Sequence, residues 1–141
     1  MKIKILLLLL IVSIGACTTS PNSTNSNDAQ KWQQTITELN ALLREKKHQK
    51  AIDEARQKLS QLLAATANAT IPNDTLAKYA RQILNLSYFS YLGSKQFRPG
   101  IEYLDSISDN PFLQQYCKHE LLSTRASLHQ MYGDNQAAIR L

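Results

Sequence analysis

Apolar residues recur at spacings of three and four along this 141-residue chain, from about residue 31 onwards. Residues at these spacings share one face of an α-helix, so the pattern predicts amphipathic helices that bury that face. No segment alternates apolar and polar residues in the way that a half-buried strand does. The sequence therefore predicts an all-α domain over residues 31–141, with helices that pair as antiparallel hairpins.

The first helix is predicted to begin near Asp28, a suitable N-cap, and the second to follow a turn within residues 46–48. Neither Gly nor Pro marks this turn, so one continuous helix is the alternative. The apolar faces consist of Trp32, Ile36, Leu39, Leu42 and Leu43 in the first helix and Ala51, Ala55, Leu59, Leu62 and Leu63 in the second.

A third helix is predicted to start at a cap formed by Asn73 or Asp74. It is predicted to end at Gly93, in the left-handed conformation that glycine adopts readily. Its apolar residues cover several sides, which predicts a central position with neighbours on both flanks. They are Leu76, Tyr79, Ala80, Ile83, Leu84, Leu86, Tyr88, Tyr91 and Leu92.

Three further helices are predicted in the C-terminal part. A short helix starts at Pro99, and a longer one has Asn110 as its cap, Pro111 in its first turn and continues to Met131. A tight turn over residues 132–134 then leads into a last helix over residues 135–141.

The first thirty residues have a different pattern. Residues 1–16 combine two early lysines, an apolar core over residues 5–14 and small residues at the end, which is typical of a secretory signal peptide. As a helix this core would span about 15 Å, roughly half of a bilayer's hydrocarbon thickness, so a permanent membrane span is the weaker alternative. Residues 18–26 contain no aliphatic or aromatic side chain and predict a disordered linker.

The motif Ile14-Gly15-Ala16-Cys17 follows the apolar core and resembles the lipobox of bacterial lipoproteins. The resemblance implies cleavage after Ala16, a diacylglyceryl group on the thiol of Cys17 and an acyl chain such as palmitate on its amino group. Two or more acyl chains form a stable membrane anchor, whereas one chain is marginal. An ordinary secreted protein with a coincidental cysteine is the alternative.

We therefore expect three segments: a signal peptide over residues 1–16, a lipidated cysteine with a disordered linker over residues 17–30, and the helical domain over residues 31–141. No acidic residue follows Cys17 directly, which favours an anchor on the periplasmic side of the cell envelope. The sequence does not distinguish the inner from the outer membrane.

The charge pattern and the cysteine content limit which molecules this chain can bind and which disulfides it can form. The chain has 16 Lys and Arg against 11 Asp and Glu, and the cations are interleaved with acids instead of forming a basic stripe. We therefore expect no nucleic-acid partner. With Cys17 lipidated, Cys117 has no partner for an internal disulfide and is expected to be a small buried hydrophobic residue. A dimer linked through Cys117 is the alternative.

Candidate chemistry is sparse. His48, His119 and His129 are far apart and lack the spacing of metal ligands. The four glycines are isolated, and no serine occupies a Gly-x-Ser-x-Gly elbow. We expect no enzyme, no metal and no cofactor apart from the covalent acyl groups at Cys17.

A small residue followed by isoleucine occurs three times, at Ala51, Gly100 and Ala138. This step resembles the start of the second helix in tetratricopeptide repeats, and Ala126 matches the small packing position of that family's first helix. The spacings, 49 residues from Ala51 to Gly100 and 38 from Gly100 to Ala138, exceed the family's period of about 34. The resemblance implies a divergent array of stacked hairpins, and an unrelated helical bundle is the alternative.

Within residues 79–141, three segments stand out: Leu86-Ser-Tyr-Phe-Ser-Tyr-Leu92, Asn110-Pro-Phe-Leu-Gln-Gln-Tyr-Cys117 and Tyr132-Gly-Asp-Asn-Gln-Ala-Ala-Ile139. With them, this stretch is also similar to the periplasmic helical-repeat region of Bacteroides-type sensor histidine kinases. This second resemblance implies an alternative function, the N-terminal sensor region of a two-component kinase in truncated form. It also implies further repeats, or a second subunit, packed on the C-terminal helix.

Tyr79, Tyr88, Phe89 and Tyr91 concentrate aromatic side chains in the third helix. Core packing is one interpretation, and a concave aromatic surface for a peptide is the other. For the second we name Arg81, Tyr88 and Tyr91 as partner contacts. The sequence as a whole predicts a membrane-anchored, periplasm-facing lipoprotein that binds an envelope protein or peptide through a helical scaffold.

Overall fold

The computed structural model describes residues 22–69 and 71–140, and within these residues it contains helices and turns but no strand. The prediction of an all-α fold is confirmed. The elements are α1 (Asn22–Arg44), α2 (His48–Ala65), the short 3-10 helix η1 (Thr66–Asn68), α3 (Asn73–Ser94), α4 (Phe97–Ile107), α5 (Pro111–Tyr116), α6 (Lys118–Tyr132) and α7 (Asn135–Ile139).

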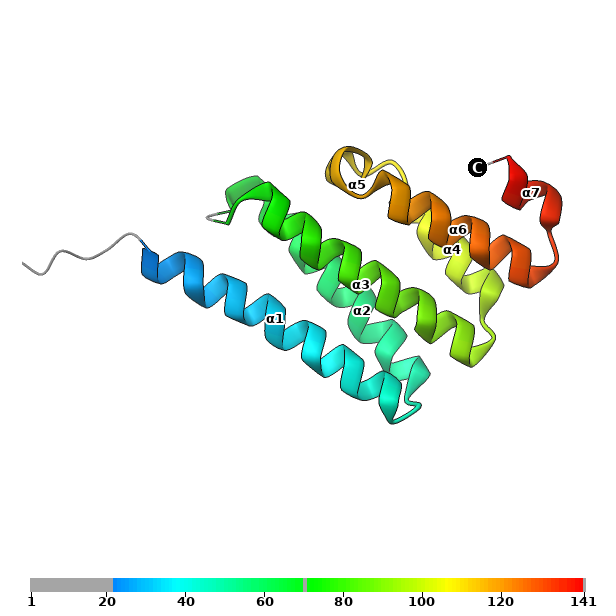
Figure 1. The fold of residues 1–141 in the computed structure, drawn as a ribbon, viewed down its shortest axis with the longest axis horizontal. Helices are drawn as coiled ribbons and strands as arrows, with labels where there is room; N and C mark the ends of the chain where they lie inside the picture. The colour runs from blue at the N-terminus through cyan, green and yellow to red at the C-terminus, as the bar shows by residue number, and fades with distance from the viewer. Residues whose placement is uncertain (1–21, 70, 141) are drawn as a thin grey trace, which may run out of the picture.

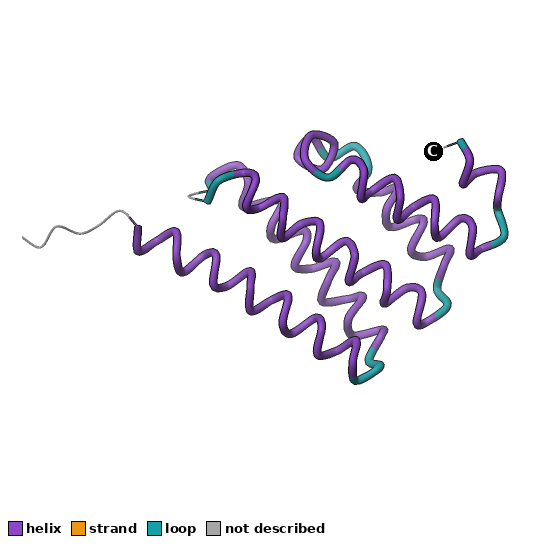
Figure 2. Tube along the Cα trace, viewed as in Figure 1, coloured by secondary structure: helices purple, strands orange, loops and turns teal. Residues whose placement is uncertain are grey.

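The helices form two layers around α3 (Figures 1 and 2). In the view of Figure 1, α1, α3 and α6 lie side by side in front, and α2 and α4 lie behind them. Helix α3 packs against α1, α2, α4, α5 and α6, which is the central position predicted from its broad apolar surface. Helix α7 packs against α6 at the C-terminal end of the row.

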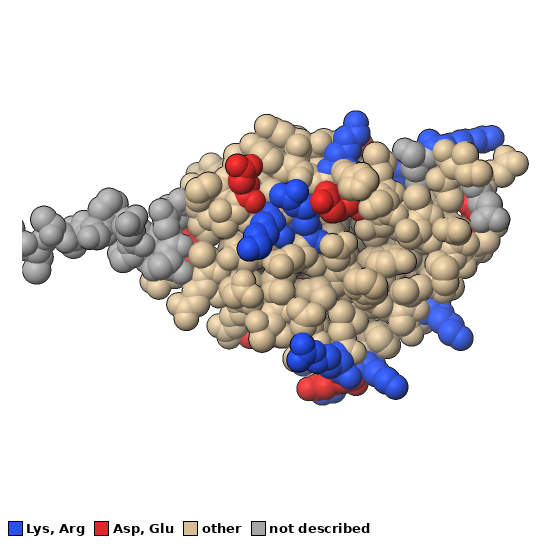
Figure 3. Space-filling view, in the orientation of Figure 1, with Lys and Arg blue, Asp and Glu red and all other residues tan. Residues whose placement is uncertain are grey.

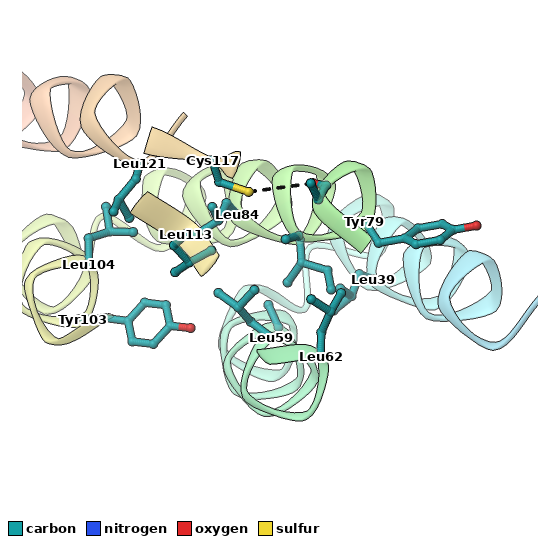
Figure 4. Packing of buried hydrophobic residues seen from close by; sticks show 14 of the residues in the cluster. Leu39, Leu59, Leu62, Tyr79, Leu84, Tyr103, Leu104, Leu113, Cys117 and Leu121 are labelled. Atoms are coloured by element: carbon teal, nitrogen blue, oxygen red, sulfur yellow. Dashed lines mark hydrogen bonds between the residues drawn. The ribbon is translucent and has the colours of Figure 1, made fainter. Parts of the chain in front are cut away.

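One hydrophobic core runs through both layers and collects side chains from α1 to α6 (Figure 4). Most of the core residues belong to the predicted apolar faces. Burial of such faces is the main favourable contribution to helix packing. Leu62, Ile83, Leu84 and Leu113 are 0% exposed. Thr35, Ser87, Ser90 and Thr124 are also buried, although the apolar pattern did not predict them.

Helix α1 begins at Asn22, earlier than the predicted cap at Asp28. The expected disordered linker over residues 17–30 therefore overlaps the first turns of this helix, and the expected boundary at residue 31 lies inside it. The hydroxyl of Tyr79 donates a hydrogen bond to the carbonyl of Ala29 at 3.2 Å, and Trp32 is buried, so tertiary contacts hold this helix from about residue 29 onwards. Residues 17–21 lie outside the described residues.

The predicted turn between the first two helices is confirmed, and the continuous-helix alternative is wrong. Helix α1 ends at Arg44, Lys46 adopts a positive φ of 56°, and α2 starts at His48. The amide of Lys47 donates to the carbonyl of Leu42 at 2.9 Å, which closes the end of α1. A lysine can hold this left-handed conformation at a modest cost, so the turn needs no glycine.

Gly93 does not end the third helix as predicted. Helix α3 continues to Ser94, and Lys95 takes the left-handed position with a φ of 57°. Gly93 instead allows close packing, because a Cβ atom there would lie 2.3 Å from Cε1 of His48 in α2. Neither predicted cap of α3 forms: Pro72 occupies the N-cap position, and no side chain makes a capping hydrogen bond.

The predicted fifth helix is split into α5 and α6. Cys117 leaves the helical conformation with φ −131° and ψ 15°, so the two helices run in different directions. The break buries the Cys117 side chain against α3, with Sγ 3.8 Å from the carbonyl oxygen of Ala77. The predicted cap is confirmed, since the Asn110 side chain accepts hydrogen bonds from the amides of Phe112 and Leu113.

The last predicted turn is also confirmed. Gly133 has a φ of 93°, the left-handed conformation that ends α6. The side chain of Asp134 then caps α7 by accepting from the amide of Ala137 at 3.0 Å. None of the helices in the described part of the chain is both long enough and apolar enough to cross a membrane.

Candidate functional site

The C-terminal half of α3 presents an uncharged surface with exposed aromatic area. Residues 82–94 contain no Asp, Glu, Lys or Arg. Phe89 is 53% exposed, Tyr88 is half-buried, and their ring centroids are 5.2 Å apart. A single exposed apolar side chain is ordinary, but one that adjoins a second aromatic ring on an uncharged surface is a candidate contact for a partner.

A groove lies between α3 and α6 beside these rings. We call it the α3–α6 groove; its volume is about 230 Å³, and its lining residues are Asn85, Tyr88, Phe89, Ser123, Thr124 and Ser127. Its polar groups are amides and hydroxyls, which can donate and accept hydrogen bonds without carrying charge.

A second hollow of about 440 Å³ adjoins this groove through Ser127. We call it the C-terminal hollow; it is lined by Ala126, Ser127, Gln130, Ala138 and Ile139. The side chain of Ile139 is 85% exposed. The two hollows together give one uncharged surface that extends from α3 over α6 to α7.

Two arginines of α3 and α6 pair with acids. Nη1 of Arg81 lies 3.8 Å from Oε1 of Glu120, and Nε of Arg125 lies 2.5 Å from Oδ1 of Asp105 on α4. Figure 3 shows the charged side chains in separate groups, with an uncharged area between them over α6 and the adjoining part of α3.

The three predicted partner contacts are not all at this surface. Tyr88 lines the α3–α6 groove. Arg81 is not among the lining residues, and its side chain is 40% exposed and paired with Glu120. Tyr91 is only 1% exposed and packs in the core, so its assignment as a partner contact is wrong. Tyr79 is buried as well, and core packing is the correct interpretation for both residues.

The predicted small packing residues occupy different environments. Ala51 is 1% exposed, and Gly100 is buried between α3 and α6. A Cβ atom on Gly100 would lie 2.8 Å from Cδ1 of Leu128 and 2.9 Å from Cγ of Tyr91. Ala126 and Ala138 are half-buried and line the C-terminal hollow.

Cys117 is 0% exposed, and burial raises the pKa of its thiol to about 11. It therefore behaves as the small buried hydrophobic residue predicted from the sequence, and the alternative of a dimer linked through Cys117 is wrong for this fold. Among the residues from 22 to 140 that the structure describes, no group of three or more His, Cys, Asp or Glu is placed to hold a metal ion.

Phe89 belongs to the aromatic cluster seen in the sequence but was not among the predicted contacts, and Asn85, Ser123 and Ser127 were not predicted at all. The one property that these three polar residues share in the sequence is the absence of charge. That property is a weak indication of a binding site, because uncharged polar residues are equally typical of an ordinary solvated helix face. Ala16 and Cys17 lie outside the described residues, so the lipidation site remains a prediction.

Comparison with known proteins adds no relative: no protein-family model, curated protein or solved structure was found to match this chain.

Proposed function

We propose that this protein is an envelope lipoprotein, anchored through Cys17 on the periplasmic side of a membrane, that binds a protein segment in the α3–α6 groove. The observation that carries the binding role is Phe89, which is 53% exposed beside Tyr88 on a surface lined by uncharged residues. The anchor is supported by the apolar core over residues 5–14 and by the lipobox-like motif that follows it. The role is binding, not catalysis.

The groove suits a protein partner for energetic reasons. Complete burial of a phenylalanine side chain is worth about 1.5–3 kcal/mol, so covering the exposed half of Phe89 contributes about 1 kcal/mol. The hydroxyls of Ser123 and Ser127 and the amide of Asn85 can pair with the backbone of a bound segment. No cation lines the groove, so its lining offers nothing to neutralise a nucleic-acid backbone.

We further propose that the helices form a short array of tetratricopeptide-like hairpins, with α1 and α2, α3 and α4, and α5–α6 and α7 as three successive pairs. Two features support this arrangement. The first long helix of each pair (α1, α3 and α6) lies in the same layer, and the small residues Ala51 and Gly100 are buried near the start of α2 and α4. Stacked hairpins present such a layer as an extended binding surface.

Site-specific photo-crosslinking in cells tests the binding role. A photoreactive amino acid in place of Phe89 or Ser123 is expected to form an adduct of defined mass with one envelope protein. The matched control is the same amino acid at Gln57, an exposed residue of α2 in the other layer. The proposal fails if positions 89 and 123 give no adduct, or give the same products as position 57.

Fractionation and mass spectrometry test the anchor. Cys17→Ala should release the protein from membranes, whereas the unaltered chain should stay in the membrane pellet in high salt. Because two or three acyl chains hold the anchor, salt should not extract it. An unmodified thiol on the mature N-terminus, or an intact leader, would exclude lipidation.

A further inference from the structure

A second groove, distinct from the α3–α6 groove, lies between α2 and α4 in the rear layer of Figure 1. We call it the α2–α4 groove; its volume is about 640 Å³, and it is lined by Arg56, Ser60, Leu63, Ala64, Tyr103, Ile107 and Asn110. Sites for small molecules commonly measure about 300–1,000 Å³, so this groove has the size of one.

Arg56 is the charged residue among these lining residues, and its guanidinium is already oriented. It lies over the ring of Tyr103, 4.8 Å from the centroid. Tyr103 is 9% exposed and reaches from α4 towards α2, with its hydroxyl directed into the space between the two helices (Figure 4). A guanidinium that stacks its face on a ring directs its N–H groups outwards from its edge, where they can bind a carboxylate. The Arg56 side chain also lies beside the hydroxyl of Tyr91, which is neutral and leaves the charge of Arg56 unpaired.

No acid in the described part of the chain occupies that edge. Arg56 forms no ion pair within 4.0 Å among these residues, and Asp53, one turn earlier on α2, accepts a hydrogen bond from Gln49 at 3.1 Å. Burial raises the pKa of Tyr91 and of Tyr103, so both phenols are neutral at physiological pH and do not balance the charge of Arg56. The groove thus has one positive charge with no carboxylate within ion-pair distance among the described residues.

The remaining lining residues define the rest of the ligand. Leu63, Ala64 and Ile107 give an apolar wall, and Ser60 and Asn110 add neutral hydrogen-bonding groups. We propose that the α2–α4 groove binds a small carboxylate with an apolar body, its carboxylate on Arg56 and its body against Leu63 and Ile107. A single guanidinium matches a singly charged carboxylate better than a phosphate monoester, which carries about two charges. This inference does not rest on the proposed function.

Photo-affinity labelling of the purified full chain tests this site. The probe is octanoate with a diazirine on its hydrocarbon chain, and the corresponding primary amide is the neutral comparison. Labelled peptides are mapped by mass spectrometry. We expect the octanoate probe to label residues 56–64 or 103–110, and the amide to label them at least about tenfold less, because a hydrogen bond to a charged group is worth about 1.5–3 kcal/mol.

Arg56→Gln should reduce labelling by the same factor, and Arg56→Lys should give an intermediate value because lysine keeps the charge but not the planar fork. Arg56 is exposed, so these variants should keep the helical circular-dichroism spectrum of the unaltered chain. Lys58→Gln is the matched control: it removes the same charge from α2 but on the side that faces α1, and labelling should not change.

Three results would overturn the proposal. Equal labelling by the amide probe would show that charge is irrelevant. Undiminished labelling of Arg56→Gln, or label spread over the chain instead of in the α2–α4 groove, would show that the groove does not bind the carboxylate. Stronger competition by octyl phosphate than by octanoate would assign the site to a phosphate instead.

Discussion

Gly100 provides the sharpest test of how closely α4 approaches its neighbours. A Cβ atom at this position would lie 2.8 Å from Cδ1 of Leu128 and 2.9 Å from Cγ of Tyr91. The leucine methyl group is at the end of a flexible side chain and can rotate away. Cγ of Tyr91 is the root of a ring that is 1% exposed, so it cannot move without displacing the core. Gly100→Ala therefore forces α4 away from α3.

The expected magnitude follows from two opposing effects. Replacing glycine by alanine within a helix stabilises it by about 1 kcal/mol, whereas overpacking a well-filled core costs about 1–3 kcal/mol. We expect Gly100→Ala to lower the free energy of unfolding by about 1 kcal/mol, and Gly100→Leu, with three more heavy atoms in the same space, by about 3 kcal/mol.

Denaturant unfolding followed by circular dichroism measures these changes. Gly133→Ala is the control for backbone strain alone, because Gly133 has a φ of 93° and no heavy atom within 4 Å of the added Cβ; its cost should be about 1 kcal/mol. In a Leu128→Ala background, Gly100→Ala should be less costly by about 0.5–1 kcal/mol, since one of the two clashes is removed. The reasoning is refuted if Gly100→Ala is more stable than the unaltered chain, or if Gly100→Leu is no worse than Gly100→Ala.

Three further predictions use the same unfolding assay. Ser87 is buried and its hydroxyl has no hydrogen-bond partner among the described residues, whereas the hydroxyl of Ser90 donates to the carbonyl of Leu86 at 2.7 Å. The Ser87→Ala variant should therefore be more stable than the Ser90→Ala variant by about 1 kcal/mol. Equal free energies of unfolding would contradict this. Burial raises the pKa of the Cys117 thiol from 9.0 to about 11, so the unfolded chain loses this proton at a lower pH than the folded chain. The free energy of unfolding should therefore fall between pH 9 and about 11, and it should fall more in the unaltered chain than in Cys117→Ala. The folded chain should also resist alkylation by iodoacetamide until denaturant is added. Asn110→Ala should cost about 1 kcal/mol through loss of the α5 cap, and Asn110→Asp, which keeps the acceptor oxygen, should cost less.

Local sequence patterns were sufficient for most of the helices. The spacing of Trp32, Ile36 and Leu39 predicted a helix with one buried face, and all three residues are buried in α1. Asn110 before Pro111 and the glycine at position 133 marked a helix start and a helix end correctly. These signals are local because a cap or a left-handed turn depends on the conformation of a few neighbouring residues.

The candidate binding surface was only partly predictable. Tyr88, Phe89 and Tyr91 are aromatic residues within one turn of α3, yet Tyr91 is in the core, Tyr88 lines the α3–α6 groove and Phe89 is exposed. Their side chains point in different directions around the helix, and the position of α6 decides which of them is covered. The α2–α4 groove was not predicted at all, because Arg56 and Tyr103 are 47 positions apart in the sequence.

By itself, then, the sequence determined the all-helical class, most of the helix positions and the apolar faces, because helical periodicity and end signals act over a few residues. Only the tertiary structure decided that Gly93 serves close packing and not helix termination, that Cys117 divides two helices, and which aromatic side chains remain exposed. These outcomes depend on contacts between residues far apart in the chain, such as Gly93 with His48 and Cys117 with Ala77. No local pattern encodes such contacts, because burial is a property of the assembled layers.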